Sequence, residues 1–299
     1  MILDENQEMV RDMARRFATE KLAPNAAEWD RTGTFPKAEL AEMGALGLLG
    51  MLVPEDWDGA MSDHVAYALA LEEIAAGDGA MSTIMSVHNS VGCVPILKYG
   101  TDEQRDTFLR PMARGEKLGA FCLTEPHAGS DASALKTRAT RTNSGWKLNG
   151  TKQFITSGQN ADIAIVFAVT DPDAGKKGIS AFVVPTDTPG YRVASLEKKL
   201  GQTLSDTAQI AFENVEIPAE NLLGVEGQGY RIALSNLEGG RIGIAAQSVG
   251  MARAALGHAV AYAQDRQSMG TNLMGHQAVA FRLADMATKV EVAHQMVLH

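Results

Sequence analysis

The chain has 299 residues, of which 45% are hydrophobic and 21% are charged, and its formal net charge is −9. This composition is typical of a globular protein with two or three domains. The acidic balance argues against a nucleic-acid binder, because phosphate contacts need a basic face. No signal-peptide pattern and no apolar run of about 20 residues is visible, so we expect no membrane span. The two cysteines, Cys93 and Cys122, lack metal or disulfide spacing. We therefore expect a reducing compartment, either a bacterial cytoplasm or a mitochondrial matrix.

Residues 1–118 have the periodicity of helices that pack against one another. Asp4 is expected to cap the first helix, with the Gln7 side chain returning a hydrogen bond as in a capping box. Pro24 is expected to end that helix, and a longer apolar helix is expected to be broken or kinked at Pro95, because proline lacks a backbone donor. The pattern predicts that these helices pack against one another, and it indicates no catalytic or binding residues in them.

From Gly119 the apolar period changes from 3.6 to 2, which predicts strands. The strands are expected at 119–123, 146–156, 162–169, 179–185 and 206–212. Asn149-Gly150 divides the second of these, and because that dipeptide tolerates positive φ angles, a tight hairpin is expected there. The block is typical of a small β-barrel or β-sandwich domain.

Helical periodicity returns after Gly224, first in a long Ala- and Gly-rich helix over 230–264. A final amphipathic segment begins at Gln277 and is still periodic at His299 without a stop signal, so we expect a chain truncated inside a helical bundle. The expected fold is therefore α+β and multidomain. It comprises an N-terminal helical domain (1–118), a middle β-barrel or sandwich domain (119–223) and the first helices of a C-terminal helical bundle (224–299).

One loop carries the strongest functional signal. The residues at 123–131 read Leu-Thr-Glu-Pro-His-Ala-Gly-Ser-Asp, a turn-rich stretch at a strand end where main-chain groups can hold a polar ligand. This stretch closely resembles the first signature of the acyl-CoA dehydrogenase flavoproteins. Three further stretches are similar to that family: 149–158, 238–243, and 262–266 together with His276-Gln277. The resemblance runs from residue 1 to residue 299.

The resemblance implies FAD as the cofactor, and no Gly-x-Gly-x-x-Gly pattern points to a different dinucleotide site. The family places a Thr at the position of Thr156 beside the flavin atom that receives hydride, and often a Trp where this chain has Phe154. Arg266 and Gln277 are expected to reach the FAD of a neighbouring subunit. The residues implied in cofactor binding are Phe121, Leu123, Thr124, Gly129, Ser130, Phe154, Ile155, Thr156, Arg266 and Gln277.

The resemblance also implies an acyl-CoA site formed by Ser130, Glu238 and Arg241. Removal of the α-proton of a thioester needs a carboxylate base, which most of the family carries on a later helix that would lie beyond His299. Some relatives carry it just before the long-helix arginine, where this chain has Gly240, and Glu125 is not the base in the family. We therefore predict no catalytic base within these residues, and an inactive 299-residue chain.

The activity implied is FAD-dependent dehydrogenation of an acyl-CoA to the trans-2-enoyl-CoA, with electrons passed to an electron-transfer flavoprotein, in a homotetramer that binds neither nucleic acid nor membrane. The resemblance at Gly239-Gly240-Arg241 favours short or branched acyl chains as substrates, as in lipid or branched-chain amino-acid catabolism. Two alternatives remain open at this point. One is an acyl-CoA oxidase or flavin monooxygenase relative that uses oxygen directly, and the other is a non-catalytic flavin-binding fragment.

Overall fold

The computed structural model describes residues 2–299. By their contacts the residues form two compact units, each of which is built from separate stretches of chain. One unit comprises Met1–Ala27, His64–Thr83 and Ile242–His299. The other comprises Glu28–Asp63 and Ile84–Arg241, and it contains the whole of the large β-sheet. The predicted fold class is confirmed: a helical N-terminal part, a β middle part and a helical C-terminal part.

The first part of the chain is helical, as predicted. Asp4 caps the first helix, and the reciprocal bonds of the capping box are present, with Gln7 N–H donating to Asp4 Oδ1 (2.8 Å) and Gln7 Oε1 accepting from Asp4 N–H (3.1 Å). The α-helices up to the first strand are α1 (Glu5–Phe17), α2 (Ala23–Thr32), α3 (Lys37–Ala45), α4 (His64–Gly77), α5 (Gly79–Val87), α6 (Val94–Tyr99), α7 (Asp102–Gln104) and α8 (Arg110–Ala113).

Prolines inside these helices are accompanied by widened turns. The π-helical segments η1 (Ala18–Leu22), η3 (His88–Cys93) and η4 (Arg105–Leu109) each end two residues before a proline, namely Pro24, Pro95 and Pro111. A proline has no N–H to donate and its ring crowds the preceding turn, and a π-turn gives the backbone the extra room. The predicted end of the first helix at Pro24 is therefore wrong, because the chain stays helical through it. The irregularity predicted at Pro95 lies just before it, in η3.

One helical stretch, Gly79–Tyr99, is long and apolar enough to cross a membrane, contrary to the expectation from the sequence. However, 83% of its most apolar window is buried inside the protein. Core helices of globular proteins have this property, so the stretch is accounted for by packing.

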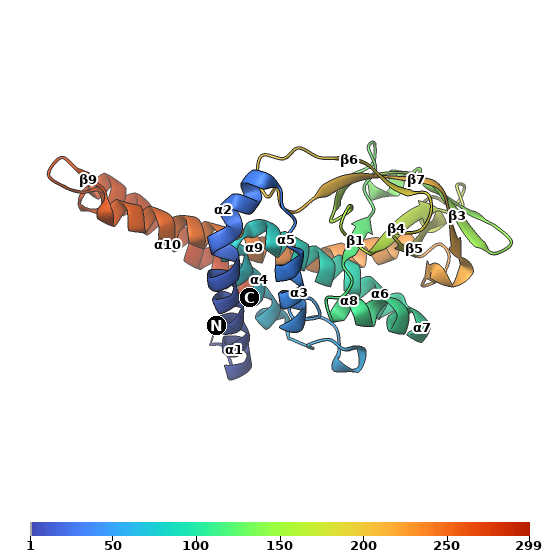
Figure 1. The fold of residues 1–299 in the computed structure, drawn as a ribbon, viewed down its shortest axis with the longest axis horizontal. Helices are drawn as coiled ribbons and strands as arrows, with labels where there is room; N and C mark the ends of the chain where they lie inside the picture. The colour runs from blue at the N-terminus through green and yellow to red at the C-terminus, as the bar shows by residue number, and fades with distance from the viewer. Residues whose placement is uncertain (1) are drawn as a thin grey trace. The chain divides into compact units, whose positions relative to one another are not determined.

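The middle part of the chain forms one eight-stranded mixed sheet (Figure 1). Its path runs β6-β7-β3-β2-β4-β5-β8, with β1 paired to β4. One face covers an apolar cluster that includes Trp146 and Phe182, and the other packs against helical residues such as Ile96 and Ile232. The strands are β1 (Gly119–Cys122), β2 (Arg138–Arg141), β3 (Gly145–Thr156), β4 (Ile163–Val169), β5 (Ile179–Pro185), β6 (Tyr191–Leu196), β7 (Thr207–Pro218) and β8 (Leu222–Leu223).

Two strands share one edge of β4. β1 pairs in parallel with the first residues of β4, from Gly119 opposite Ile163 to Cys122 opposite Val166. β2 pairs in parallel with the last residue of β4, Arg138 opposite Val169, while β5 occupies the whole of the other edge. β1 and β2 therefore act as one interrupted strand, and residues 123–137 leave and re-enter the sheet at the interruption.

The hairpin predicted at Asn149-Gly150 is wrong. β3 is one continuous strand, and both of its halves pair antiparallel with β7. The dipeptide instead forms a β-bulge, where the register shifts between Leu148 and Gly150. Bulges and hairpin turns both favour a glycine at positive φ, so the local signal did not distinguish them; the long partner strand β7 does.

Gly150→Ala is expected to lower the free energy of unfolding by about 2 kcal/mol, as in other overpacked sites. Gly150 has φ +153°, and an added Cβ would lie 2.4 Å from Thr137 Oγ1 and 2.7 Å from Thr137 Cα. Urea denaturation would measure the change. Gly257→Ala is the control, because it meets open space in an exposed helix and should raise stability by up to about 1 kcal/mol. Equal effects of the two substitutions would contradict the close approach at Thr137.

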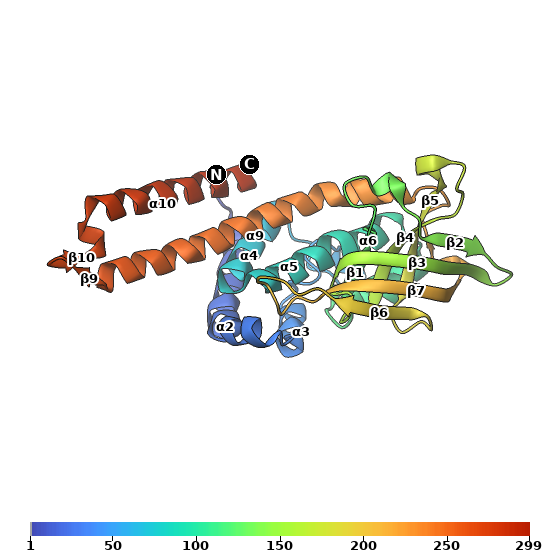
Figure 2. The ribbon, with the colours of Figure 1, turned by 90° about the horizontal axis from the view of Figure 1, so that it is seen from above.

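The C-terminal part is a pair of long helices, α9 (Gly229–Asp265) and α10 (Gln277–Leu298). Figure 2 shows α10 running back along the later part of α9, with the short strands β9 (Gln267–Ser268) and β10 (Thr271–Asn272) at the turn. The turn residues Met269 and Gly270 have φ angles of 52° and 83°. In the same unit, the buried Glu73 of α4 accepts hydrogen bonds from both Arg15 and Arg253.

Candidate functional site

The loop over residues 123–137, which contains the first signature and is called the signature loop below, begins where β1 ends. Glu125 and Ala128 exchange backbone hydrogen bonds, with Glu125 N–H donating to the Ala128 carbonyl (2.9 Å) and Ala128 N–H to the Glu125 carbonyl (3.1 Å). This closes a tight turn over residues 125–128, and the two residues that follow it, Gly129 and Ser130, are exposed. A Cβ at Gly129 would meet nothing within 4 Å. The outer side of the turn is thus open to a ligand.

A buried ion pair holds the inner side of the same loop. Lys152 of β3 is fully buried, and its Nζ donates to Glu125 Oε1 (2.8 Å) and to the Leu123 carbonyl (3.0 Å). Glu125 is 3% exposed and also accepts from the backbone N–H groups of Lys136 (2.7 Å) and Thr137 (3.0 Å). One carboxylate thus fastens both ends of the loop to the strand beneath it.

The charges in this pair are well compensated. Burial raises the pKa of Glu125, but the Lys152 ammonium and the hydrogen bonds from residues 136, 137 and 152 outweigh burial and hold that pKa below its usual value. Burial lowers the pKa of Lys152, and the Glu125 carboxylate opposes this. A carboxylate with this many donors is a structural anchor and a poor proton acceptor.

The residues that the first signature predicts beside the flavin ring lie next to the 149–158 stretch, which contains Phe154. The Thr124 carbonyl accepts a hydrogen bond from the N–H of Gln153 (2.8 Å), the residue before Phe154. Phe121 is half-buried, with its ring edge-on to Phe167 at a centroid distance of 5.0 Å, and Leu123 is buried in the core. The structure therefore brings the two segments together through their backbones.

Phe154 lies at an irregularity of β3, where the register with β7 shifts between Lys152 and Ile155. Its φ is +58°, which is unusual for an aromatic residue, and 62% of its surface is exposed. Ile155 is buried and Thr156 is half-buried. The bulge thus turns a large apolar ring out of the sheet, and strain of this kind is commonly found at functional sites.

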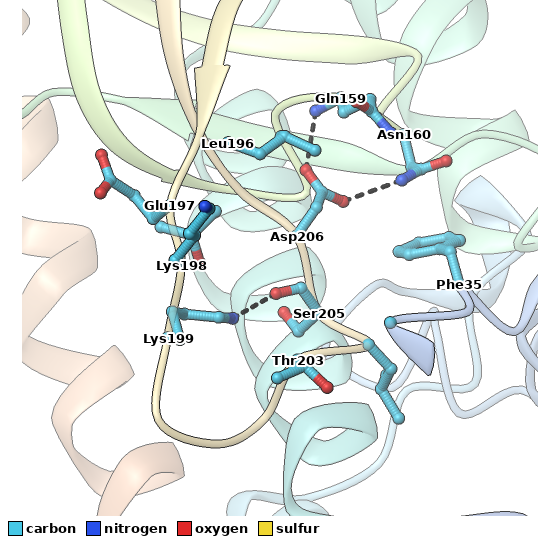
Figure 3. Close-up of a pocket in the computed structure, with 13 residues that line it drawn as sticks. Phe35, Gln159, Asn160, Leu196, Glu197, Lys198, Lys199, Thr203, Ser205 and Asp206 are labelled. Atoms are coloured by element: carbon cyan, nitrogen blue, oxygen red, sulfur yellow. Dashed lines mark hydrogen bonds between the residues drawn. The ribbon is translucent and has the colours of Figure 1, made fainter. Parts of the chain in front are cut away.

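A cavity of about 440 Å³ lies beside the turn that follows Thr156. Asp206 fixes this turn: its Oδ2 accepts from Gln159 N–H (2.8 Å) and its Oδ1 from the Asn160 side chain (3.0 Å), as Figure 3 shows. The Lys199 side chain donates to the carbonyls of Gln202 and Ser205, so it closes the opposite loop. The cavity is lined by Gly33, Phe35, Gln159, Asn160, Leu196, Glu197, Lys198, Lys199, Thr203, Leu204, Ser205, Asp206 and Thr207.

The predicted substrate residues lie on α9. Glu238 and Arg241 are exposed, and Gly240 between them faces η3, where an added Cβ would lie 3.6 Å from Ser90 Oγ and 3.9 Å from Val91 Cγ1. These residues belong to the same unit as the signature loop. Position 240 carries no side chain that could act as a base.

Arg266 and Gln277 belong to the other unit, where they flank the turn between α9 and α10. Both side chains are exposed. The backbone of Arg266 is fixed on both sides, because its N–H donates to the Tyr262 carbonyl (2.9 Å) and its carbonyl accepts from Leu273 N–H (2.9 Å).

Sequence reasoning missed the role of Lys152. The signal was available, because a lysine in an apolar strand at an inward-facing position needs a buried acid, and the signature loop supplies Glu125. Reasoning from the sequence also missed His88, a buried histidine in η3 that bonds to the first residue of β1.

Known proteins resemble this chain along its whole length. An acyl-CoA dehydrogenase of Bacillus subtilis (strain 168) is 48% identical over 299 residues, which cover 100% of this chain and 79% of that protein. The solved structure of butyryl-CoA dehydrogenase from Megasphaera elsdenii has a TM-score of 0.96 and 42% identity, over 99% of this chain and 79% of that one. A chain in a solved structure described as the electron transferring flavoprotein of Acidaminococcus fermentans has a TM-score of 0.98 and 43% identity, over 100% of this chain and 79% of that one.

Family models give the same result in three consecutive segments. The N-terminal, middle and C-terminal domain models of acyl-CoA dehydrogenases match residues 4–116, 120–215 and 227–299. Members of this family are FAD-dependent oxidoreductases, which confirms the predicted cofactor and enzyme class. By these matches the chain belongs to the acyl-CoA dehydrogenase family.

Proposed function

We propose that the protein dehydrogenates a short-chain acyl-CoA between Cα and Cβ to give the trans-2-enoyl-CoA. The observation that carries this proposal is the pairing of an anchored signature loop with the exposed Phe154 bulge. Short acyl chains are favoured because butyryl-CoA dehydrogenase is among the similar structures. Whole-length similarity to the Bacillus subtilis enzyme supports the reaction class.

The residues present fit a flavin. Phe154 offers an exposed aromatic wall, Gly129 leaves the backbone of the loop open to close approach, and Ser157 Oγ is buried without a partner among the residues described here. FAD, when bound, would supply the acceptor for the hydride that leaves Cβ. The residues proposed to hold it in this subunit are Phe121, Leu123, Thr124, Gly129, Ser130, Phe154, Ile155 and Thr156.

The remaining cofactor residues suggest an assembly. Arg266 and Gln277 are exposed at the turn between the long helices, and a guanidinium is suited to a phosphate. In this proposal they bind the FAD of a neighbouring copy within a homotetramer. The exposed apolar side chains of the same two helices, among them Tyr262 and Phe281, are consistent with burial against other copies.

The acyl-CoA would be bound by Ser130, Glu238 and Arg241, and the proposal assigns no base to the residues described. Glu125 is held by Lys152 and two backbone donors, and Gly240 has no side chain. The chain spans 79% of the length of the Bacillus subtilis relative. We therefore propose that the α-proton is removed by a glutamate beyond His299, as the family resemblance implies.

Electrons would leave to an electron-transfer flavoprotein, a proposal supported by the similarity to a chain in the Acidaminococcus fermentans electron transferring flavoprotein structure. A bacterial cytoplasm or a mitochondrial matrix would provide that partner. Direct use of oxygen, as in an oxidase, is the competing chemistry, and the rate at which air reoxidises the reduced flavin separates the two.

The test is an anaerobic visible spectrum of the protein loaded with FAD, before and after butyryl-CoA and a panel of longer and branched acyl-CoAs. The 299-residue chain is expected to bind FAD without bleaching, and a chain extended past His299 is expected to bleach with a short acyl-CoA. Failure of both to bind FAD would overturn the proposed function. Bleaching in the 299-residue chain would show that the base lies within it.

A further inference from the structure

His88 is completely buried in η3 and makes two directed hydrogen bonds. Its Nδ1 lies 3.0 Å from the Gly119 N, and its Nε2 lies 3.0 Å from the Met112 carbonyl oxygen. Gly119 N–H can only donate and a carbonyl can only accept, so Nδ1 is the bare acceptor and Nε2 carries the proton. One tautomer of the neutral ring therefore satisfies both partners.

The surroundings of the ring keep it neutral and exclude a reactive role. Burial lowers the pKa of His88 to about 4, although the backbone groups of Met112 and Leu49 and the charge of Asp162 act in the opposite direction. Cys93 Sγ is 3.5 Å from Nε2, but that nitrogen already directs its proton at Met112. Burial also raises the pKa of the Cys93 thiol far above neutrality, so the pair is not a nucleophile with its base.

Gly119, which the ring holds, is the first residue of β1, and it packs directly on η3. A Cβ at this position would lie 3.2 Å from Gly92 Cα and 2.6 Å from Met112 Cε. The strand and the π-segment thus approach each other at two glycines, Gly119 and Gly92, with the end of the Met112 side chain beside both. Phe121 follows two residues later, opposite Ile165 of β4, and the signature loop begins immediately after the strand.

We propose that His88 is a positioning residue for the flavin site. By accepting the Gly119 N–H, it fixes where β1 begins, and so where Phe121 and Thr124 are held. The inference rests on the proposed function, since it assumes that these two residues line the flavin. π-segments are often associated with functional sites, and here η3 supplies the histidine that faces the strand.

Two substitutions separate positioning from stability, because each removes one of the two buried hydrogen bonds. In His88→Asn, Oδ1 takes the place of Nδ1 and keeps the bond from Gly119, while the bond to Met112 is lost. In His88→Gln, Nε2 keeps the bond to Met112, while Gly119 N–H loses its acceptor. His88→Gln is expected to weaken FAD binding about tenfold and to shift the flavin absorption band, whereas His88→Asn keeps the wild-type spectrum.

Thermal melts of both apoproteins show whether the two variants are destabilised alike, so that a spectral difference cannot come from unfolding. If the two variants give the same flavin spectrum, the inference is wrong. If wild-type protein binds no FAD, the proposed function fails instead. Should His88→Gln not fold, Gly119→Ala is the second variant, because its Cβ would lie 3.2 Å from Gly92 Cα, so that β1 or η3 must shift by a few tenths of an ångström with His88 in place. It is expected to shift the flavin band, and an unchanged band would equally overturn the inference.

Discussion

Lys152→Met is expected to lower the free energy of unfolding by about 3–5 kcal/mol, as for other buried pairs that lose one partner, and to abolish FAD binding. The substitution leaves the Glu125 carboxylate, which is 3% exposed, without its cation and removes the donor to the Leu123 carbonyl. The signature loop then loses the link to β3 that lies beneath it. Urea denaturation and an FAD titration followed by flavin fluorescence would measure the two effects.

Lys147→Met is the matched control. Lys147 lies on the same strand, and its Nζ is 3.0 Å from Glu216 Oε1, but both side chains are more than a third exposed. Exposed pairs contribute at most about 1 kcal/mol, so this variant should keep both its stability and its flavin. Equal stability of the two variants would show that Lys152 and Glu125 do not anchor the loop.

Acidification should destabilise the wild-type protein more than the His88→Asn variant. The folded-state pKa of His88 is about 4, against 6.5 for an unperturbed histidine. Between these values the unfolded chain takes up a proton that the native ring does not, so the stability contributed by the neutral ring is complete above pH 6.5. It is lost as the pH falls toward 4, by about 3 kcal/mol in all.

The measurement compares urea denaturation of wild-type protein and His88→Asn at pH 7, 6, 5 and 4.5. Both proteins share every other titrating group, so the difference between their curves isolates the ring. The free energy of unfolding of the wild-type protein minus that of the variant should be constant above pH 6.5. Below pH 6.5 it should decrease, because only the wild-type protein loses the stability of the neutral ring. Parallel curves over the whole range would contradict the buried neutral histidine.

Local rules predicted the elements of the fold well where neighbours in sequence decide the structure. The Asp4–Gln7 capping box formed as expected, because all its groups lie within one turn. The strand at 179–185 was predicted with its observed bounds, and the long helix at 230–264 within one residue at each end. In these segments periodicity and burial agree.

The predictions failed where distant partners decide. Asn149-Gly150 has the composition of a hairpin turn, but twelve-residue β7 pairs with both sides of it and keeps β3 straight. Pro24 has the composition of a helix end, but η1 provides room for its ring. The local sequence at Asn149-Gly150 does not indicate the partner strand, and the local sequence at Pro24 does not indicate the widened turn.

For the site, resemblance pointed to the signature loop and to the 149–158 stretch, and the structure adds the bulge at Phe154 and the contacts that hold the loop. The resemblance predicts that Thr124 and Phe154 belong to one site, and the bond from Gln153 N–H to the Thr124 carbonyl brings their backbones close together. Lys152 and His88 were not assigned, because each acts through a residue at least 27 positions away. Contacts of that span need the tertiary structure.

Because of the interruption between β1 and β2, the loop can open without unfolding of the sheet. Residues 123–137 leave the edge of β4 at Cys122 and return at Arg138, so both ends of the loop stay fixed to the sheet whatever its middle does. The bond from Val169 N–H to the Thr137 carbonyl (2.8 Å) ties the end of the loop to β4, and opening the residues before it breaks the Lys152 and Gln153 contacts but no bond between β4 and β5. Local opening of this kind needs less free energy than global unfolding. A ligand as large as a dinucleotide could therefore enter and leave while the sheet retains its shape.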